Sequence, residues 1–229
     1  MRLEPYTRNK QTSHMRTKSL LLAAAVGLAG ALSASAQSTN VYSVNAVGYV
    51  QVNLPAGYSL ISNPLNGTNN ALNTIIPNAP DNAFIFRFNS ISQTFDSTVP
   101  QYFLGFGWFP NSTIDPGEGF FINVSTPTNI TFVGEVPQGS LTNSIPVGYS
   151  MRSSIVPKGG SFDAIGFPAG DNDTVISFNS ATQSYSPTVP QYFNGVGWFP
   201  AAPTNQVGGA FFIVKSSGTN WVSTFSASN

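Results

Sequence analysis

The sequence contains no cysteine, and its one histidine is His14. Without cysteine the chain has neither disulfides nor a thiolate nucleophile. Without a histidine after residue 14, Ser-His-Asp and Cys-His triads are excluded from its main part. Zinc and copper sites built on histidine or cysteine are excluded there as well. The folded part must therefore be held together by its apolar core.

Charged side chains are scarce, at 8% of the 229 residues. Of the nine basic residues, five lie before residue 37, together with one of the nine acids, so residues 37–229 carry a net charge of −4. Nucleic acids require a basic surface for their phosphates, and this part of the chain has none. A partner nucleic acid is therefore not expected, and an anionic membrane surface is disfavoured on the same ground.

Residues 1–36 are predicted to be a leader and signal peptide. A basic start (Arg16, Lys18) precedes the apolar run at 20–32, and Ala34-Ser35-Ala36 forms an A-x-A cleavage site. The run is short for a membrane span, which needs about 20 apolar residues. Met15 is an alternative start, and a retained anchor is the alternative to cleavage. The prediction is a secreted protein (periplasmic, cell-surface or extracellular) with no membrane contact once the signal is removed.

A repeated segment divides the rest of the chain. TVPQYFLGFGWFP at 98–110 returns as TVPQYFNGVGWFP at 188–200, with eleven of thirteen positions identical. Neighbouring segments match at offsets of 90 or 91, which predicts a tandem duplication. The expected modules are 37–137 and 138–229, each of ~90 residues of recognisable repeat. Because the connection VPQGSL is short, they should lie against each other, and one continuous sandwich is the alternative.

The hydrophobic pattern predicts an all-β fold. Val50, Val52 and Leu54 alternate with polar or exposed-type residues, and 83–89 places three phenylalanines on one face. Short strands with turn signals every 8–12 residues indicate an antiparallel β-sandwich or partly open barrel in each copy. Only residues 71–77 suggest a helical turn.

Two segments carry a resemblance to a known group of proteins. GYSLISNPL (57–65) and DPGEGFFIN (115–123) are similar to a module in secreted, largely uncharacterised β-repeat proteins of verrucomicrobial and planctomycete-type bacteria. The resemblance implies an exported or surface-associated β module and supplies no catalytic residues. The second copy departs from the pattern, since Gly208-Gly209-Ala210 replaces G-E-G and Ser154-Ile155-Val156 replaces N-P-L.

The aromatic residues of the repeated segment have two interpretations. Tyr102, Phe103, Trp108 and Phe109, with their counterparts Tyr192, Phe193, Trp198 and Phe199, could form platforms for sugar rings beside Gln101, Gln191 and Asn194. Alternatively, they fill the core of each copy, because large aromatic side chains dominate core burial. The tryptophans follow glycine in a loop and are expected to be partly exposed. The candidate ligand-binding residues are Gln101, Tyr102, Trp108, Gln191, Tyr192 and Trp198.

Acidic residues offer two weaker hypotheses. Asp171 and Asp173, in the loop Asp171-Asn172-Asp173, have the oxygen ligands that calcium prefers, although such residues are also ordinary turn formers. A pair of carboxylates would suffice for glycoside hydrolysis, but across the copies only Asp81 and Asp171 match. No cofactor other than calcium is expected.

These observations favour an exported, non-catalytic β protein that binds a polysaccharide or a cell-surface matrix. The alternatives are a structural component that self-assembles through exposed strand edges, and, less favoured, a carboxylate-based glycoside hydrolase. The sequence leaves the oligomeric state open.

Overall fold

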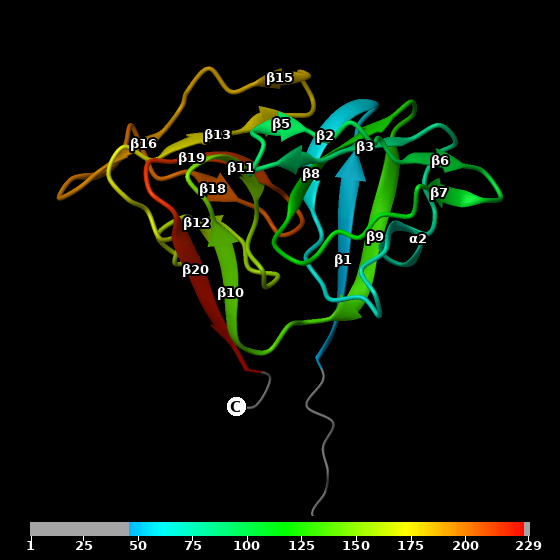
Figure 1. Cartoon of the computed structure of the whole chain (residues 1–229), viewed down its shortest axis with the longest axis horizontal. Helices are drawn as coiled ribbons and strands as arrows, with labels where there is room; N and C mark the ends of the chain where they lie inside the picture. Colours follow the sequence, from blue (N-terminus) through cyan, green and yellow to red (C-terminus); the bar gives the residue numbers. More distant parts are fainter. Residues whose placement is uncertain (1–45, 227–229) are drawn as a thin grey trace, which may run out of the picture. The chain divides into compact units, whose positions relative to one another are not determined.

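The computed structural model describes residues 46–226, so the predicted leader, signal peptide and cleavage site lie outside the described residues. The described chain is almost entirely β, as predicted (Figure 1). We call residues 46–137 the first half and residues 138–226 the second half. The predicted boundary at 137/138 falls between the last strand of one half and the first strand of the other.

The first half contains nine strands and one helical turn. Their bounds are β1 Val47–Leu54, β2 Gly57–Ser62, α2 Leu72–Ile75, β3 Phe84–Phe86, β4 Phe88–Asn89, β5 Thr94–Phe95, β6 Gln101–Phe103, β7 Gly107–Phe109, β8 Gly119–Val124 and β9 Thr128–Glu135.

The second half contains eleven strands among its described residues. Their bounds are β10 Gly139–Ile145, β11 Gly148–Arg152, β12 Gly160–Ser161, β13 Thr174–Ile176, β14 Phe178–Asn179, β15 Ser184–Tyr185, β16 Gln191–Phe193, β17 Gly197–Phe199, β18 Thr204–Asn205, β19 Phe211–Lys215 and β20 Thr219–Phe225.

Each half is built on one antiparallel five-stranded sheet. The first sheet has the strand order β2-β8-β3-β6-β7, and the second sheet has the order β11-β19-β13-β16-β17. These orders correspond strand for strand under the sequence offsets of 90 and 91. A short hairpin follows the central strand of each sheet: β4–β5 comes directly after β3, and β14–β15 comes directly after β13.

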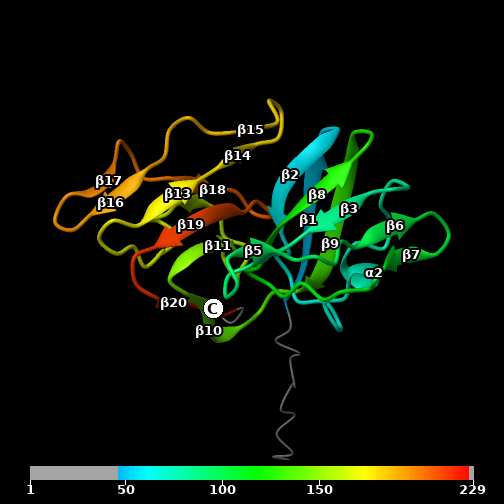
Figure 2. The same cartoon turned by 45° about the horizontal axis from the view of Figure 1, so that its top comes forward.

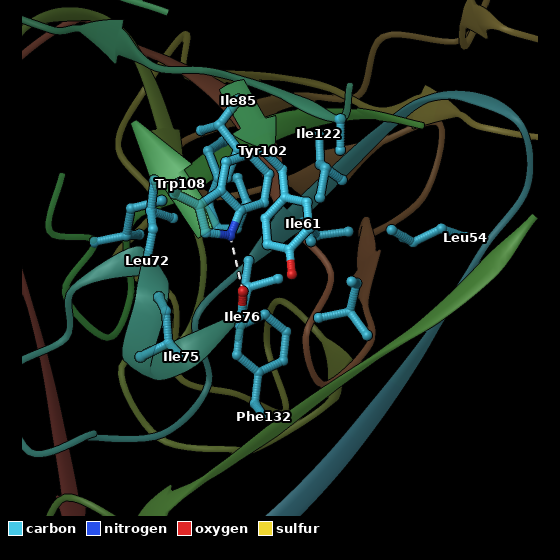
Figure 3. Packing of buried hydrophobic residues seen from close by; sticks show 14 of the residues in the cluster. Leu54, Ile61, Leu72, Ile75, Ile76, Ile85, Tyr102, Trp108, Ile122 and Phe132 are labelled. Atoms are coloured by element: carbon cyan, nitrogen blue, oxygen red, sulfur yellow. Dashed lines mark hydrogen bonds between the residues drawn. The ribbon is translucent and has the colours of Figure 1, made fainter. Parts of the chain in front are cut away.

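A long two-stranded ribbon completes the core of each half. The strand β1 alternates between exposed and partly buried positions along its length and pairs with β9 over eight residues. Its inward side chains pack with those of β9 and the first sheet, as Leu54, Ile85, Ile122 and Phe132 illustrate (Figure 3). β10 and β20 form the equivalent ribbon, whose Ile145 and Trp221 join the second core. The apolar side chains between the ribbon and the five-stranded sheet are covered on both sides, and this burial stabilises strands that are too short to be stable alone.

The two halves share a third apolar cluster. Its buried members come from both halves, with Leu60 and Phe121 from the first and Met151 and Phe212 from the second. The rings of Phe121 and Phe212 lie 6.3 Å apart. The predicted contact between the modules therefore exists, and it is an apolar one.

A reciprocal exchange of glutamine side chains joins the halves at the outer strands β2 and β11. Gln183, which follows β14, accepts a hydrogen bond from the Tyr58 N–H (2.7 Å) and donates one to the Tyr58 carbonyl (2.9 Å). Gln93, which follows β4, makes the matching pair with Tyr149, at 2.7 and 3.0 Å. Figure 2 shows the β14–β15 hairpin reaching β2. Each glutamine thus covers one part of an outer edge, and the backbone of the other half covers the next part, since the Ser62 N–H donates to the Gly208 carbonyl and the Ser153 N–H to the Gly117 carbonyl.

Glycine is required where these glutamines bind. Gly57 has φ +96°, and a Cβ there would lie 2.4 Å from the Gln183 Oε1 atom. Gly148 has φ +85°, and its Cβ would lie 2.7 Å from Gln93 Oε1. Any other residue would meet both an unfavourable backbone conformation and a clash at these two positions.

Candidate functional site

The repeated segment forms a hairpin at the far edge of each five-stranded sheet. In the first half, Gln101 pairs with Phe109, Tyr102 with Trp108, and Phe103 with Gly107. Because side chains alternate across a strand, this register divides the candidate residues between two faces. Tyr102 and Trp108 point into the core, whereas Gln101 and Phe109 point outward.

The expectation that Trp108 is partly exposed is wrong. Only 2% of its surface is exposed, and its indole Nε1 donates a hydrogen bond of 2.8 Å to the Ile76 carbonyl (Figure 3). Tyr102 is also buried, and its ring meets that of Trp108 edge to face at 5.4 Å. These two candidates therefore belong to the core, because the strand period turns them away from solvent.

The corresponding residues of the second half are less buried. Trp198 and Tyr192 are each partly exposed, as expected for Trp198, and their rings meet at 5.4 Å. Trp198 packs edge to face on Phe162. Its indole nitrogen has no hydrogen-bond partner within residues 46–226.

A row of five side chains crosses the outer face of the first sheet. Tyr58 pairs with Asn123, Asn123 with Phe84, Phe84 with Gln101, and Gln101 with Phe109. One residue comes from each strand, so aromatic rings and amides alternate across the whole sheet. We call these residues the aromatic–amide row. All five reach the surface, and Phe109 is 75% exposed.

The spacing of strands sets the length of this row. Neighbouring strands lie about 4.8 Å apart, so the four intervals from Tyr58 to Phe109 span roughly 19 Å. At its Tyr58 end the row adjoins a cleft of about 320 Å³ between the halves, lined mainly by aromatic rings and by Gln183. No charged side chain belongs to the row or to the lining of this cleft.

The second sheet has the same residue types at three of the five corresponding positions. The matching positions are Tyr149, Val214, Thr174, Gln191 and Phe199. Val214 stands where the first sheet has Asn123, and Thr174 stands where it has Phe84. Gln101 and Gln191, the two amide candidates of the sequence analysis, therefore lie on equivalent outer faces with different neighbours.

Asp81 and Asp171, the acids that match across the halves, both hold the hairpins in place. Asp81 Oδ1 accepts a hydrogen bond from the Leu104 N–H at 2.9 Å. Asp171 Oδ1 accepts one from the Asn194 N–H, also at 2.9 Å. Their position in the repeat is explained by this structural role.

The two calcium candidates are held by protein contacts. Asp173 is fully buried, and its Oδ2 forms an ion pair with Lys215 and accepts a hydrogen bond of 2.6 Å from the Gly170 N–H. Asp171 is occupied as described above. No group of three or more acidic, histidine or cysteine side chains in the described part of the chain is arranged to hold a metal ion.

One pair of carboxylates lines a cavity. Asp115 and Glu118 both border a space of about 530 Å³ that also contacts Arg152. Glu118 Oε2 accepts the Asp115 N–H at 3.0 Å and lies 3.6 Å from Arg87 Nη2, while Asp115 Oδ1 accepts an amide hydrogen of Asn70. Burial lowers the pKa of the Arg152 guanidinium, and the nearby Glu118 opposes that shift. These carboxylates hold a turn, and Glu118 also pairs with Arg87.

Sequence reasoning missed three members of the row, Tyr58, Phe84 and Asn123. They lie on three different strands, and nothing local shows that they stand beside Gln101. The one available signal was strand alternation. Once Trp108 is assigned to the core, Gln101 and Phe109 must face outward, and the side chains paired with them follow.

Comparison with known proteins identifies no relative. No family model matches this sequence, no curated protein is significantly similar to it, and no solved structure matches its fold significantly. The resemblance to secreted bacterial β-repeat proteins therefore stays a prediction. Among residues 46–226, no helix is both long and apolar enough to span a membrane.

Proposed function

We propose that this protein is an exported, non-catalytic carbohydrate-binding protein, and that the aromatic–amide row of the first sheet holds a polysaccharide chain. The single observation that carries the proposal is the row itself. Five exposed or partly exposed side chains from five strands alternate between aromatic rings and amides. The proposed partner is an extracellular or cell-surface polysaccharide.

The chemistry of the row suits sugars. An aromatic face accepts the apolar C–H face of a pyranose ring, because both surfaces leave water when they meet. Primary amides both donate and accept hydrogen bonds, which matches the hydroxyl groups around each ring. Asn123 and Gln101 stand between aromatic rings and would bind hydroxyls of successive sugar units. An uncharged row also favours a neutral polysaccharide over a sulfated or strongly acidic one.

The non-catalytic part of the proposal rests on where the acids lie. The row contains no carboxylate, and Asp115 and Glu118, which border one cavity together, form part of a turn. A glycosidase needs two carboxylates that flank the scissile bond. Export is proposed from residues 1–36 of the sequence, and the absence of a nucleic-acid partner from the low basic charge.

Binding to a panel of soluble neutral and acidic polysaccharides, measured by affinity electrophoresis and calorimetry, tests the proposal. We expect retention by a neutral polysaccharide. Phe109→Ala should weaken it roughly tenfold, corresponding to about 1.4 kcal/mol, and Phe84→Ala should act in the same direction. Tryptophan emission is a poor reporter here because Trp108 is buried.

Two controls keep this experiment specific. Phe199→Ala removes the matching phenylalanine of the second sheet, and Ile91→Ala removes a side chain that is 92% exposed away from the row. Both variants should bind as the unmodified protein does. Equal loss of binding in Phe109→Ala and Phe199→Ala would contradict an assignment to the first sheet. Release of reducing sugar ends during incubation would contradict the non-catalytic assignment.

A further inference from the structure

The outer edges of the two five-stranded sheets are closed by amide side chains at three of four places. These edges are the strands β2, β7, β11 and β17. Gln183 closes β2 and Gln93 closes β11, each by pairing with the N–H and C=O of one tyrosine. Exposed strand edges are templates for pairing with other chains, and proteins usually protect them.

Asn73 closes β7 in the same way. The Trp108 N–H donates to Asn73 Oδ1 at 2.6 Å, and Asn73 Nδ2 donates to the Trp108 carbonyl at 3.4 Å. A Cβ added at Gly107 would lie 2.4 Å from Asn73 Oδ1, which shows how closely this side chain covers the strand.

The fourth edge, β17, is open. Tyr192 N–H donates to Asp173 and the Tyr192 carbonyl accepts from Asn172, so Tyr192 uses its backbone groups on the side away from β17. The opposite residue, Trp198, therefore directs its own N–H and C=O outward. Neither group has a partner within residues 46–226, and a Cβ at Gly197 would meet nothing within 4 Å.

The residue at the position of Asn73 explains the difference. In the second half that position is Asp163, which is exposed and makes no side-chain hydrogen bond among the described residues. An ionised carboxylate accepts hydrogen bonds but cannot donate one, so it cannot satisfy both the N–H and the C=O of Trp198.

We propose that the β17 edge pairs antiparallel with the β17 edge of a second molecule of this protein. The pairing is centred on Trp198, whose N–H and C=O bind the C=O and N–H of the same residue in the other molecule. A contact of this kind is isologous and closes as a dimer. It joins the two second sheets into one continuous sheet.

The side chains beside Trp198 match this register. With Trp198 opposite itself, Phe199 of each molecule stands opposite Gly197 of the other. The ring of Phe199 is 65% exposed, and Gly197 has no side chain to obstruct it. The protein already uses this combination once, since Phe193 is opposite Gly197 within the hairpin. Residues 191–199 carry no charge that would oppose the contact.

A strand of another protein would fit the edge less well. Only Trp198 offers outward backbone groups in this three-residue strand, so a foreign strand gains two hydrogen bonds and little else. In self-pairing, two phenylalanine–glycine contacts are added by symmetry. The inference therefore commits to self-association, and it is independent of the proposed carbohydrate site on the first sheet.

Sedimentation velocity over a wide range of protein concentration tests the proposal. We expect a monomer–dimer equilibrium that Phe199→Lys abolishes, because both phenylalanine–glycine contacts are lost and two like charges are brought to diagonal positions on one face of the pairing. Phe109→Lys is the matched control. It places the same charge on β7, whose edge Asn73 closes, and it should leave the dimer unchanged while weakening polysaccharide binding. Phe199→Lys should keep that binding, so the two proposals fail separately.

Hydrogen exchange gives a readout at the atom concerned. The Trp198 amide should be protected only at concentrations where the dimer forms, whereas the Trp108 amide should be protected at all concentrations. Asn73→Asp opens the β7 edge and should convert dimers into longer assemblies. A monomer at every concentration, or an association that Phe199→Lys and Phe109→Lys affect equally, would overturn the proposal.

Discussion

The two halves fill the same pair of buried, neighbouring positions with different kinds of side chain. In the first half, the cross-strand neighbours Ala83 and Val124 are apolar and buried. In the second half, the same two positions hold Asp173 and Lys215, which are equally buried and form an ion pair. The halves differ at both positions of the pair, and the two surrounding sheets have corresponding strand orders.

The ion pair also organises the neighbouring loop. Lys215 Nζ donates to the Pro168 carbonyl at 2.9 Å, and the Ser216 N–H donates to Asp173 Oδ1 at 3.1 Å. Lys215 Nζ also lies 5.7 Å from the centre of the Phe167 ring. The second half thus uses charge where the first uses apolar contact. A buried ion pair stabilises a fold only when such additional bonds offset its desolvation.

Breaking this pair should have the largest effect on stability. Lys215→Val leaves the Asp173 carboxylate buried without its cation and should lower the free energy of unfolding by about 3–5 kcal/mol. The double variant Asp173→Ala/Lys215→Val recreates the first half's solution and should recover most of that loss. Urea denaturation measures both. A double variant as unstable as the single one would show that the loop, rather than the buried charge, determines the cost.

Replacing the two tryptophans of the repeated segment should have a smaller effect on stability than breaking the ion pair, and the effect should differ between them. Trp108→Phe leaves the Ile76 carbonyl unpaired in a fully buried site and should cost about 2–3 kcal/mol. Trp198→Phe removes an indole nitrogen that has no partner within residues 46–226, at a partly exposed position, and should cost about 1 kcal/mol. Thermal unfolding of the two variants gives the comparison. Equal losses would mean that the hydrogen bond to Ile76 contributes nothing measurable.

Gln93 and Gln183, which bind across the two halves, should each contribute less to stability than Trp108 does. Gln93→Ala and Gln183→Ala each remove two hydrogen bonds between the halves at a solvent-exposed edge, so each should cost about 1 kcal/mol. Gln51→Ala, at an exposed position of β1, should change stability little and serves as the control. Because the two sites are equivalent, a large difference between Gln93→Ala and Gln183→Ala would contradict the reciprocal description.

The smallest difference concerns Tyr185, whose first-half counterpart is Phe95. Burial raises the pKa of the Tyr185 hydroxyl above its ordinary value of 10. The folded protein then holds this proton more tightly than the unfolded chain, so its contribution to stability is present below pH 10 and is lost as the pH rises further. As the pH is raised above 10, the free energy of unfolding should fall less steeply for Tyr185→Phe than for the unmodified protein.

The secondary structure was largely predictable from local pattern, and the site was not. Alternation in 46–55 predicted β1, and the short helical turn was expected where α2 lies. The two faces of the repeated hairpin were also separable, but nothing local decides which face meets the core. That choice depends on Ile76 and Ile85, which reach Trp108 through tertiary packing. A comparison of the two halves shows that Asp173 and Lys215 stand where the first half has Ala83 and Val124, but it does not show that the charged pair is buried.

The glutamine exchange has a consequence for the chain as a whole. Each half carries one outer strand, β2 or β11, whose free edge is covered by the other half, and one glutamine that binds the outer strand of the other half. A half produced alone would expose both, and two such fragments would complete each other only by coming together. The single polypeptide therefore works as a tethered pair, in which covalent connection supplies the high local concentration that free partners would have to reach by abundance.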